Sequence, residues 1–343
     1  MITPNLQQYF EGKRVLATGG AGFIGSHLVE MLVELGAKVT VPVRKTTSLA
    51  YLSNVAADVA IEEADLFDRV QVDRVMKKGH DVVMHLAAAK GGGIAHSMDH
   101  HGSLFRDNML SFINVLDSAR EAVIPRVLVC SSACVYPRDA RVPAPEEDGV
   151  RDAPEPTNAG YGWSKRMEEF MSLSYVQEFG MNIGIARPFN AYGPRDDFFN
   201  ESNHVIPGLI TRLLGGENPF TVWGSGRQTR SFVYATDFAQ GLLMTCANEK
   251  VTGPLNIGSD EEISIAELAG MIVDLSGVNA TIVLDPSKPD GQPRRACDTS
   301  RAKAELGFEA QVSFRDGLRK TIDWYVREKR IRESATDSPL AVF

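Results

Sequence analysis

Tyr161 and Lys165 stand four residues apart in the stretch "YGWSK", where helical spacing begins. Positions i and i+4 lie on one face of a helix, so we expect the phenol and the ammonium group to lie side by side. A positive charge beside a phenol favours the phenolate and lowers the pKa of the tyrosine. Ser132, in "CSSACVYP", adds a hydroxyl that can share the proton of a reacting hydroxyl or carbonyl group. These three side chains are suited to moving a proton. The alternative interpretation is that Tyr161 and Lys165 are an exposed helical pair with no catalytic role.

A glycine-rich turn near the N-terminus predicts a cofactor for this chemistry. The stretch "TGGAGFIGSHL" follows an apolar, strand-like run and opens a helical one. Its glycines would permit a tight turn and bring a pyrophosphate against the helix N-terminus, so we predict a dinucleotide site. The residues of this turn that are expected to contact the cofactor are Gly19, Gly22, Phe23, Ile24 and Gly25.

The end of the second predicted strand bears on which dinucleotide is bound. An acidic residue there would accept a hydrogen bond from the ribose of NAD, but this chain reads "VPVRKTTS". Arg44 could pair with a 2'-phosphate, so the sequence favours NADP(H), with NAD(H) as the alternative. Further cofactor contacts are expected from Asp65, Leu66, Leu86, Ala87 and Ala88.

Alternating strand-like and helical segments must position these residues. Such alternation predicts an α/β fold, a Rossmann-type doubly wound parallel sheet. Loops lengthen after about residue 188, which indicates a smaller mixed α/β C-terminal lobe that binds substrate. We expect a dinucleotide-binding domain over residues 1–187, the lobe over 188–330 with some of the chain crossing back to the first domain, and a loose tail over 333–343.

Composition excludes several classes of protein. The 343 residues carry a net charge of -8, which disfavours nucleic-acid binding. The four cysteines are far apart without CxxC spacing, so neither a zinc ribbon nor a disulfide framework is indicated, and no metal is expected. No stretch approaches the roughly 18 apolar residues of a membrane span. We expect a soluble cytoplasmic protein.

Four motifs together resemble a known family. "GGAGFIG", "SSA", "YGWSK" and "RPFNAYGP" are similar to motifs of the extended short-chain dehydrogenase/reductase family of nucleotide-sugar epimerases, dehydratases and reductases. The resemblance implies that Ser132, Tyr161 and Lys165 are catalytic, that the lobe binds a nucleoside-diphosphate sugar and that the protein is a homodimer. The substrate-binding residues it implies are Asn190, Leu209, Trp223, Arg230 and Arg295. The two guanidinium groups suit a diphosphate.

The residue type at the position of Cys134 differs between the subfamilies of this family. Free cysteine usually packs as a small core residue, which is the simplest interpretation. In 4-epimerases of the family a small polar residue such as threonine usually holds this place, and in 4,6-dehydratases an aspartate and a glutamate stand where Ala133 and Cys134 are. A cysteine here resembles GDP-fucose synthases and GDP-mannose 3,5-epimerases, in which it acts at carbons beside a 4-keto group.

His204 favours the first of these two subfamilies. The stretch "NESNHVIPGLI" resembles the fucose-synthase segment that carries a second acid/base. The lysine that 3,5-epimerases carry in this segment is missing, because no lysine occurs between Lys165 and Lys250. Against this, the glycine turn has the epimerase form and lacks the arginine that fucose synthases commonly use for NADPH.

The leading hypothesis is therefore an NADPH-dependent enzyme acting on a GDP-linked 4-keto-sugar. Cys134 and His204 would exchange protons at C3, C5 or both, and Tyr161 would donate a proton during reduction at C4. One alternative is an epimerase with tightly held NAD(P)+ and no net redox, of the GDP-mannose 3,5-epimerase or C4 type. A silent dinucleotide-binding protein is another. The loops over residues 91–101 and 195–203 are expected to contact the sugar, without a pattern that names it.

Overall fold

Seven parallel strands form the central sheet of the computed structural model, in the order β11-β6-β5-β4-β1-β2-β3. The structure describes residues 4–89, 93–199, 204–251, 253–288, 290 and 292–336. The inner strands are apolar and buried along most of their length, as expected for a parallel sheet covered on both faces. The strands are β1 (Arg14–Thr18), β2 (Lys38–Val43), β3 (Val59–Glu63), β4 (Val82–His85), β5 (Arg126–Cys130), β6 (Ile183–Pro188) and β11 (Pro254–Ile257).

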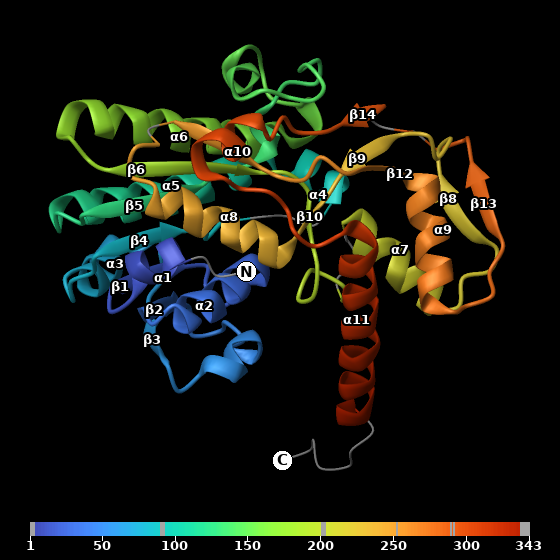
Figure 1. The fold of residues 1–343 in the computed structure, drawn as a ribbon, viewed down its shortest axis with the longest axis horizontal. Helices are drawn as coiled ribbons and strands as arrows, with labels where there is room; N and C mark the ends of the chain where they lie inside the picture. The colour runs from blue at the N-terminus through green and yellow to red at the C-terminus, as the bar shows by residue number, and fades with distance from the viewer. Residues whose placement is uncertain are drawn as a thin grey trace.

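Helices cover both faces of the sheet (Figure 1). One buried cluster joins the sheet to α1, α2, α8 and α10, and another joins it to α3, α5 and α6. This arrangement confirms the predicted Rossmann-type, doubly wound fold. The helices are α1 (Pro4–Phe10), α2 (Phe23–Glu34), α3 (Arg69–Met76), α5 (His101–Glu121), α6 (Ala159–Phe179), α8 (Ala235–Ala247) and α10 (Ser300–Leu306). Shorter segments are η1 (Ala50–Val55), α4 (Gly93–Asp99), η2 (Ala133–Val135), η3 (Glu146–Val150) and η4 (Pro156–Asn158).

A smaller lobe is built from the chain after β6 and lies beside the sheet, on the right in Figure 1. Its apolar core joins α7, α9, α11, β8 and the aromatic side chains around Phe314. The helices of the lobe are α7 (Val205–Leu214), α9 (Ile265–Ser276) and α11 (Phe314–Thr336). Its strands are β7 (Ala191–Tyr192), β8 (Phe220–Trp223), β9 (Thr229–Ser231), β10 (Val233–Tyr234), β12 (Glu262–Ser264), β13 (Ile282–Asp285) and β14 (Arg294–Arg295).

The chain crosses back to the sheet after the lobe has begun. β11 pairs with β6, and α8 packs against α2. The domain boundaries at residues 187 and 330 stay predictions.

α11 continues to Thr336, so the first four residues of the predicted tail are helical. Ion pairs from Arg332 to Glu328 and from Lys329 to Glu333 support the last turns of this helix. Residues 337–343 of that tail lie outside the described residues.

Within the described ranges, no helix is long and apolar enough to cross a membrane. The same residues contain no cluster of three or more His, Cys, Asp or Glu side chains that could hold a metal ion.

Candidate active site

The glycine turn between β1 and α2 forms a cradle that side chains would fill. Gly19 has a φ of 70°, and a Cβ there would lie 2.8 Å from the backbone nitrogen of Ala87. A Cβ on Gly25 would overlap the carbonyl oxygen of Gly19. Gly22 caps α2 without a side-chain hydrogen bond, and Phe23 and Ile24 begin the helix. The first-turn amides of α2 are therefore open to an anion, and the turn fits the pyrophosphate of a dinucleotide.

Replacing Gly25 with alanine is expected to weaken NADPH binding by about 1–3 kcal/mol, roughly five- to 150-fold in Kd, because the added methyl group must displace the turn. Calorimetric titration of the purified variant with NADPH measures this. Gly270→Ala is the matched control, since a Cβ there meets nothing within 4 Å. Equal affinity in Gly25→Ala and the wild type would show that the turn is not a cofactor cradle.

The segment after β4 is held in place by two polar side chains that the sequence did not single out. Thr18 Oγ1 accepts a hydrogen bond from the amide of Ala87 at 3.2 Å. The side chain of Asn108 accepts from the amide of Ala89 and donates to its carbonyl oxygen, both at 2.9 Å. Leu86 and Ala87 thus lie against the glycine turn; that they and Ala88 contact a cofactor stays a prediction.

The residues predicted for the adenosine end lie at the carboxyl ends of β2 and β3. Arg44 directly follows β2 and is exposed, and no hydrogen bond or ion pair engages its guanidinium group within the described part of the chain. Asp65 Oδ1 accepts from the amide of Phe67 at 3.0 Å, and the carbonyl oxygen of Leu66 accepts from Asn114 at 2.9 Å. Arg44 is therefore available to an anionic ligand.

Ser132, Cys134, Tyr161 and Lys165 are brought together where β5 ends and α6 begins. Ser132 caps η2, and its Oγ accepts from the amide of Cys134 at 3.1 Å. A Cβ on Gly162 would lie 2.5 Å from the carbonyl oxygen of Cys134, so α6 packs directly on η2. The thiol of Cys134 is half-buried, and the Asn158 amide lies 4.0 Å from its Sγ.

Lys165 lies over the Tyr161 ring, with Nζ 5.7 Å from the ring centroid. The Lys165 ammonium group donates to the carbonyl oxygen of Cys130 at 3.0 Å and to Glu168 Oε2 at 2.8 Å. Burial raises the pKa of Tyr161, Lys165 opposes that increase, and Cys134, Cys130 and Glu168 add to it. The phenol is therefore held in its protonated form, whereas the sequence alone predicted a lowered pKa.

His204 stands at the N-terminus of α7 and forms a pair with an aspartate. Its Nδ1 lies 3.1 Å from Oδ1 of Asp196, whose side chain is buried. Because the carboxylate engages Nδ1, Nε2 is left to face a ligand. No hydrogen bond joins His204 to Cys134 among the residues described.

The loop that carries Asp196 is fastened to α2. Arg195, with a φ of 73°, donates to Glu30 at 2.6 and 2.9 Å and to Ser26 Oγ at 3.1 Å. His27 Nε2 lies 3.0 Å from the carbonyl oxygen of Pro194. The Arg195 side chain thus pairs with α2, and the predicted sugar contacts at 91, 92 and 200–203 lie outside the described residues.

Arg230 and Arg295 lie opposite each other on β9 and β14. Arg295 donates to the carbonyl oxygen of Ala133 at 2.8 Å, so it reaches the turn between Ser132 and Cys134. Burial lowers the pKa of Arg230 to about 10, and the charge of Arg295 adds to this. Neither guanidinium group is ion-paired within the described residues, so both are available to an anion.

The other predicted substrate residues lie at different depths in the protein. Asn190, at the left-handed φ of 35°, donates to the carbonyl oxygen of Ser231 at 2.8 Å, next to Arg230. Trp223 ends β8 and is 58% exposed, and Lys288 Nζ lies over its ring, 5.7 Å from the centroid. Leu209 is buried in the lobe core on α7.

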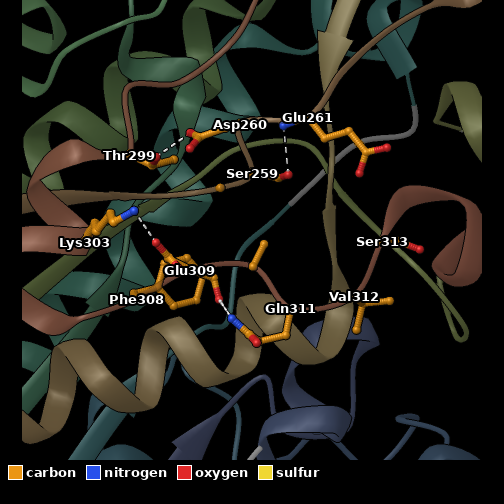
Figure 2. A pocket seen from close by; sticks show the side chains of 12 residues that line it. Ser259, Asp260, Glu261, Thr299, Lys303, Phe308, Glu309, Gln311, Val312 and Ser313 are labelled. Atoms are coloured by element: carbon orange, nitrogen blue, oxygen red, sulfur yellow. Dashed lines mark hydrogen bonds and ion pairs between the residues drawn. The ribbon is translucent and has the colours of Figure 1, made fainter.

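A separate cavity of about 330 Å³ lies beyond the end of β11 (Figure 2). Asp260 and Thr299 are hydrogen-bonded across one side of it, and Lys303 pairs with Glu309 across another. None of the predicted site residues lines it.

Comparison with known proteins shows which family the chain belongs to. Residues 15–258 match the model of the NAD dependent epimerase/dehydratase family. The chain belongs to this family. It is therefore an NAD(P)-dependent enzyme of the extended short-chain dehydrogenase/reductase type, as the motifs predicted.

Relatives within the family include reductases and synthases of nucleotide sugars. A dTDP-4-dehydro-6-deoxy-D-allose reductase from Streptomyces sp is 35% identical over 93% of this chain and 98% of its own. GDP-L-fucose synthase 1 from Arabidopsis thaliana is 32% identical over 92% of this chain and 93% of its own. An epimerase structure from Methanothermobacter thermautotrophicus aligns with a TM-score of 0.86 at 28% identity, covering 96% of this chain and 97% of the other. These relatives support a nucleotide-sugar epimerase or reductase.

Two acidic residues at the site were not predicted. Asp196 lies two residues after the family motif "RPFNAYGP" and eight residues before His204. An acidic residue between the motif and the histidine could therefore have been predicted as the partner of His204. Glu168 belongs to the run "KRMEE" on α6, and helical spacing places it one turn from Lys165.

Proposed function

We propose that the protein epimerises and reduces a GDP-linked 4-keto-sugar with NADPH. The observation that carries this proposal is the place of the half-buried Cys134: it follows Ser132 in a turn that packs on the start of α6, where Tyr161 stands, and Arg295 reaches the same turn at the carbonyl oxygen of Ala133. The relatives named as GDP-L-fucose synthases support the nucleotide and the combined reaction.

Epimerisation needs an acid and a base at carbons made acidic by the C4 ketone. One of Cys134 and His204 would remove a proton from C3 or C5, and the other would return a proton to the opposite face. Asp196 would orient the His204 ring through Nδ1, and the imidazole would take or give the proton at Nε2. The sugar configuration inverts with no change in oxidation state.

Reduction would use the hydroxyl groups of Ser132 and Tyr161. Ser132 would hydrogen-bond the C4 oxygen, and Tyr161 would donate its proton to that oxygen as the ketone becomes a hydroxyl. A bound NADPH supplies the hydride at C4. Arg44 supports NADP(H) over NAD(H), because an exposed guanidinium group after β2 would attract a 2'-phosphate.

Arg230 and Arg295 would hold the diphosphate so that the sugar points toward Cys134. Their adjacent strands and their freedom from ion pairs within the described residues suit a doubly charged group. Asn190 would help to position the sugar, and the exposed Trp223 ring would lie against the nucleoside.

The experiment is incubation of the protein in heavy water with GDP-4-keto-6-deoxymannose and NADPH. Loss of NADPH absorbance together with deuterium at a sugar carbon is the expected result, read by mass spectrometry. No NADPH oxidation together with no deuterium uptake would refute the proposal. Conversion of a GDP-hexose without added nicotinamide would instead identify the self-contained epimerase.

A second candidate is a reductase that acts on a dTDP-linked 4-keto-sugar without epimerisation. The 35% identity to the Streptomyces reductase favours it. In the same experiment with a dTDP-4-keto-6-deoxy-sugar, this candidate gives NADPH oxidation without deuterium in the product.

We also propose a homodimer in which α5 and α6 of two copies pack together. These helices lie along each other and expose apolar side chains to solvent. The exposed fractions are 40% for Leu110, 37% for Ile113, 67% for Phe170 and 40% for Leu173. Sedimentation velocity of the purified protein is expected to give twice the chain mass, and a monomer at micromolar concentration would contradict it. None of the four cysteines, all of them among the described residues, is in a disulfide, which suits a reducing cytoplasm.

A further inference from the structure

The first turn of α6 is closed by a side chain from another helix. Asn158 holds the N-cap position, where asparagine usually caps a helix through its side chain. The Asn158 side chain makes no capping hydrogen bond here. Instead, Nδ1 of His101, the first residue of α5, accepts a hydrogen bond from the amide of Gly160 at 3.1 Å. The Asn158 side chain is therefore available for another contact.

That contact is with the sulfur of Cys134. Asn158 Nδ2 lies 4.0 Å from Cys134 Sγ, and no other hydrogen bond engages the Asn158 side chain within the described part of the chain. Close packing of α6 on η2 brings the two residues together, since a Cβ on Gly162 would lie 2.5 Å from the carbonyl oxygen of Cys134. Both residues are half-buried, so water screens the contact only in part.

No other donor reaches this sulfur from the described residues. The amide of Cys134 donates to Ser132 Oγ at 3.1 Å, and Arg295 donates to the carbonyl oxygen of Ala133 at 2.8 Å. A neutral thiol is a weak hydrogen-bond acceptor, whereas a hydrogen bond to an ionised acceptor is shorter and stronger. An amide donor beside the sulfur therefore favours the thiolate over the thiol.

We propose that Asn158 is a positioning residue that donates its side-chain amide to the Cys134 sulfur and stabilises the thiolate. The inference rests on the proposed function only in assigning Cys134 to proton exchange with the sugar. The thiolate is also the form of cysteine that attacks alkylating reagents, so the effect of Asn158 can be measured without a substrate.

The test is the rate at which iodoacetamide alkylates Cys134 at neutral pH. Tandem mass spectrometry separates the label on Cys134 from label on Cys130. In Asn158→Ala we expect alkylation about three- to tenfold slower than in the wild type, because the thiolate loses its donor. In Asn158→Asp we expect it to be slower still, because a carboxylate beside the sulfur repels the thiolate.

The aspartate variant separates this role from a structural one. Aspartate has the shape of asparagine and is as good an N-cap residue, so α6 should keep its start and the protein its Tm. A role in capping or packing would leave Asn158→Asp close to the wild type. Thr157→Ala is the matched control, because Thr157 precedes Asn158 in η4 and its hydroxyl binds Glu155; Cys134 should react there as in the wild type.

The same substitution has an expected effect on catalysis. Asn158→Ala should slow deuterium exchange at the sugar carbon through kcat rather than KM, with the affinity for NADPH unchanged. Alkylation needs neither sugar nor NADPH. The expected alkylation rates without any deuterium exchange would therefore support the role of Asn158 and refute the proposed function.

The order of the three alkylation rates decides the proposal. It is supported if the wild type reacts fastest and Asn158→Asp slowest. A rate for Asn158→Asp equal to or above that of Asn158→Ala would overturn it. So would a rate for Asn158→Ala equal to or above that of the wild type, since the amide would then give the thiolate no support.

Discussion

Replacing Tyr161 with phenylalanine is expected to lower kcat for ketone reduction by about 10²–10⁴-fold, the usual contribution of a positioned proton donor. The phenol is held protonated by burial and stands at the start of α6, against the turn that carries Ser132. The measurement is single-turnover oxidation of NADPH with the keto-sugar that the protein accepts.

The affinity for NADPH should stay within a fewfold of the wild type in Tyr161→Phe, which separates lost chemistry from lost binding. Tyr175→Phe is the matched control, because Tyr175 lies on the same helix with its hydroxyl bound to Asp117. Unchanged kcat in Tyr161→Phe would mean that another group supplies the proton.

Replacing Cys134 with serine is expected to reduce deuterium exchange at C3 and C5 by at least about 10²-fold, because a serine hydroxyl is a far weaker acid than a thiol and cannot serve as the base. Ser132, Tyr161 and the glycine turn are untouched, so reduction of the keto-sugar should persist. The product should then retain the configuration of the substrate, and nuclear magnetic resonance of the product reads both results.

Cys246→Ala is the control for this substitution, since that thiol is buried on α8. If Cys134→Ser exchanges deuterium at C3 and C5 as fast as the wild type, Cys134 is a packing residue and not an acid or base. If the wild type itself reduces a keto-sugar without exchange, the reductase without epimerisation is the correct function.

The parts of the site that could be predicted are those specified by short-range spacing. The glycine turn and the Tyr161/Lys165 pair each lie within a single strand-to-helix or helical segment, and the backbone geometry of that segment fixes which side chains meet. The strand and helix alternation likewise predicted the doubly wound sheet, because each segment must bury its apolar face on a neighbour.

The parts that could not be predicted depend on residues far apart in the chain. Arg295 meets the carbonyl oxygen of Ala133 across 162 positions, and Arg195 meets Glu30 across 165. No local pattern signals such contacts, which arise only when the lobe packs on the sheet. The lowered tyrosine pKa expected from Lys165 was wrong for a related reason, since it left out burial and the carboxylate of Glu168.

The attachment of residues 193–196 to α2 bears on how enzymes of this kind can be recombined. Glu30 and Ser26 belong to the helix that follows the glycine turn, whereas Arg195 precedes the aspartate that orients His204. A hybrid that takes its N-terminal half from one relative and its lobe from another would break this ion pair, unless the residues equivalent to Glu30 and Arg195 came from the same relative. Its proton exchange would then suffer although no residue in contact with the sugar had been replaced, so residues 26–30 and 193–196 have to be transferred together.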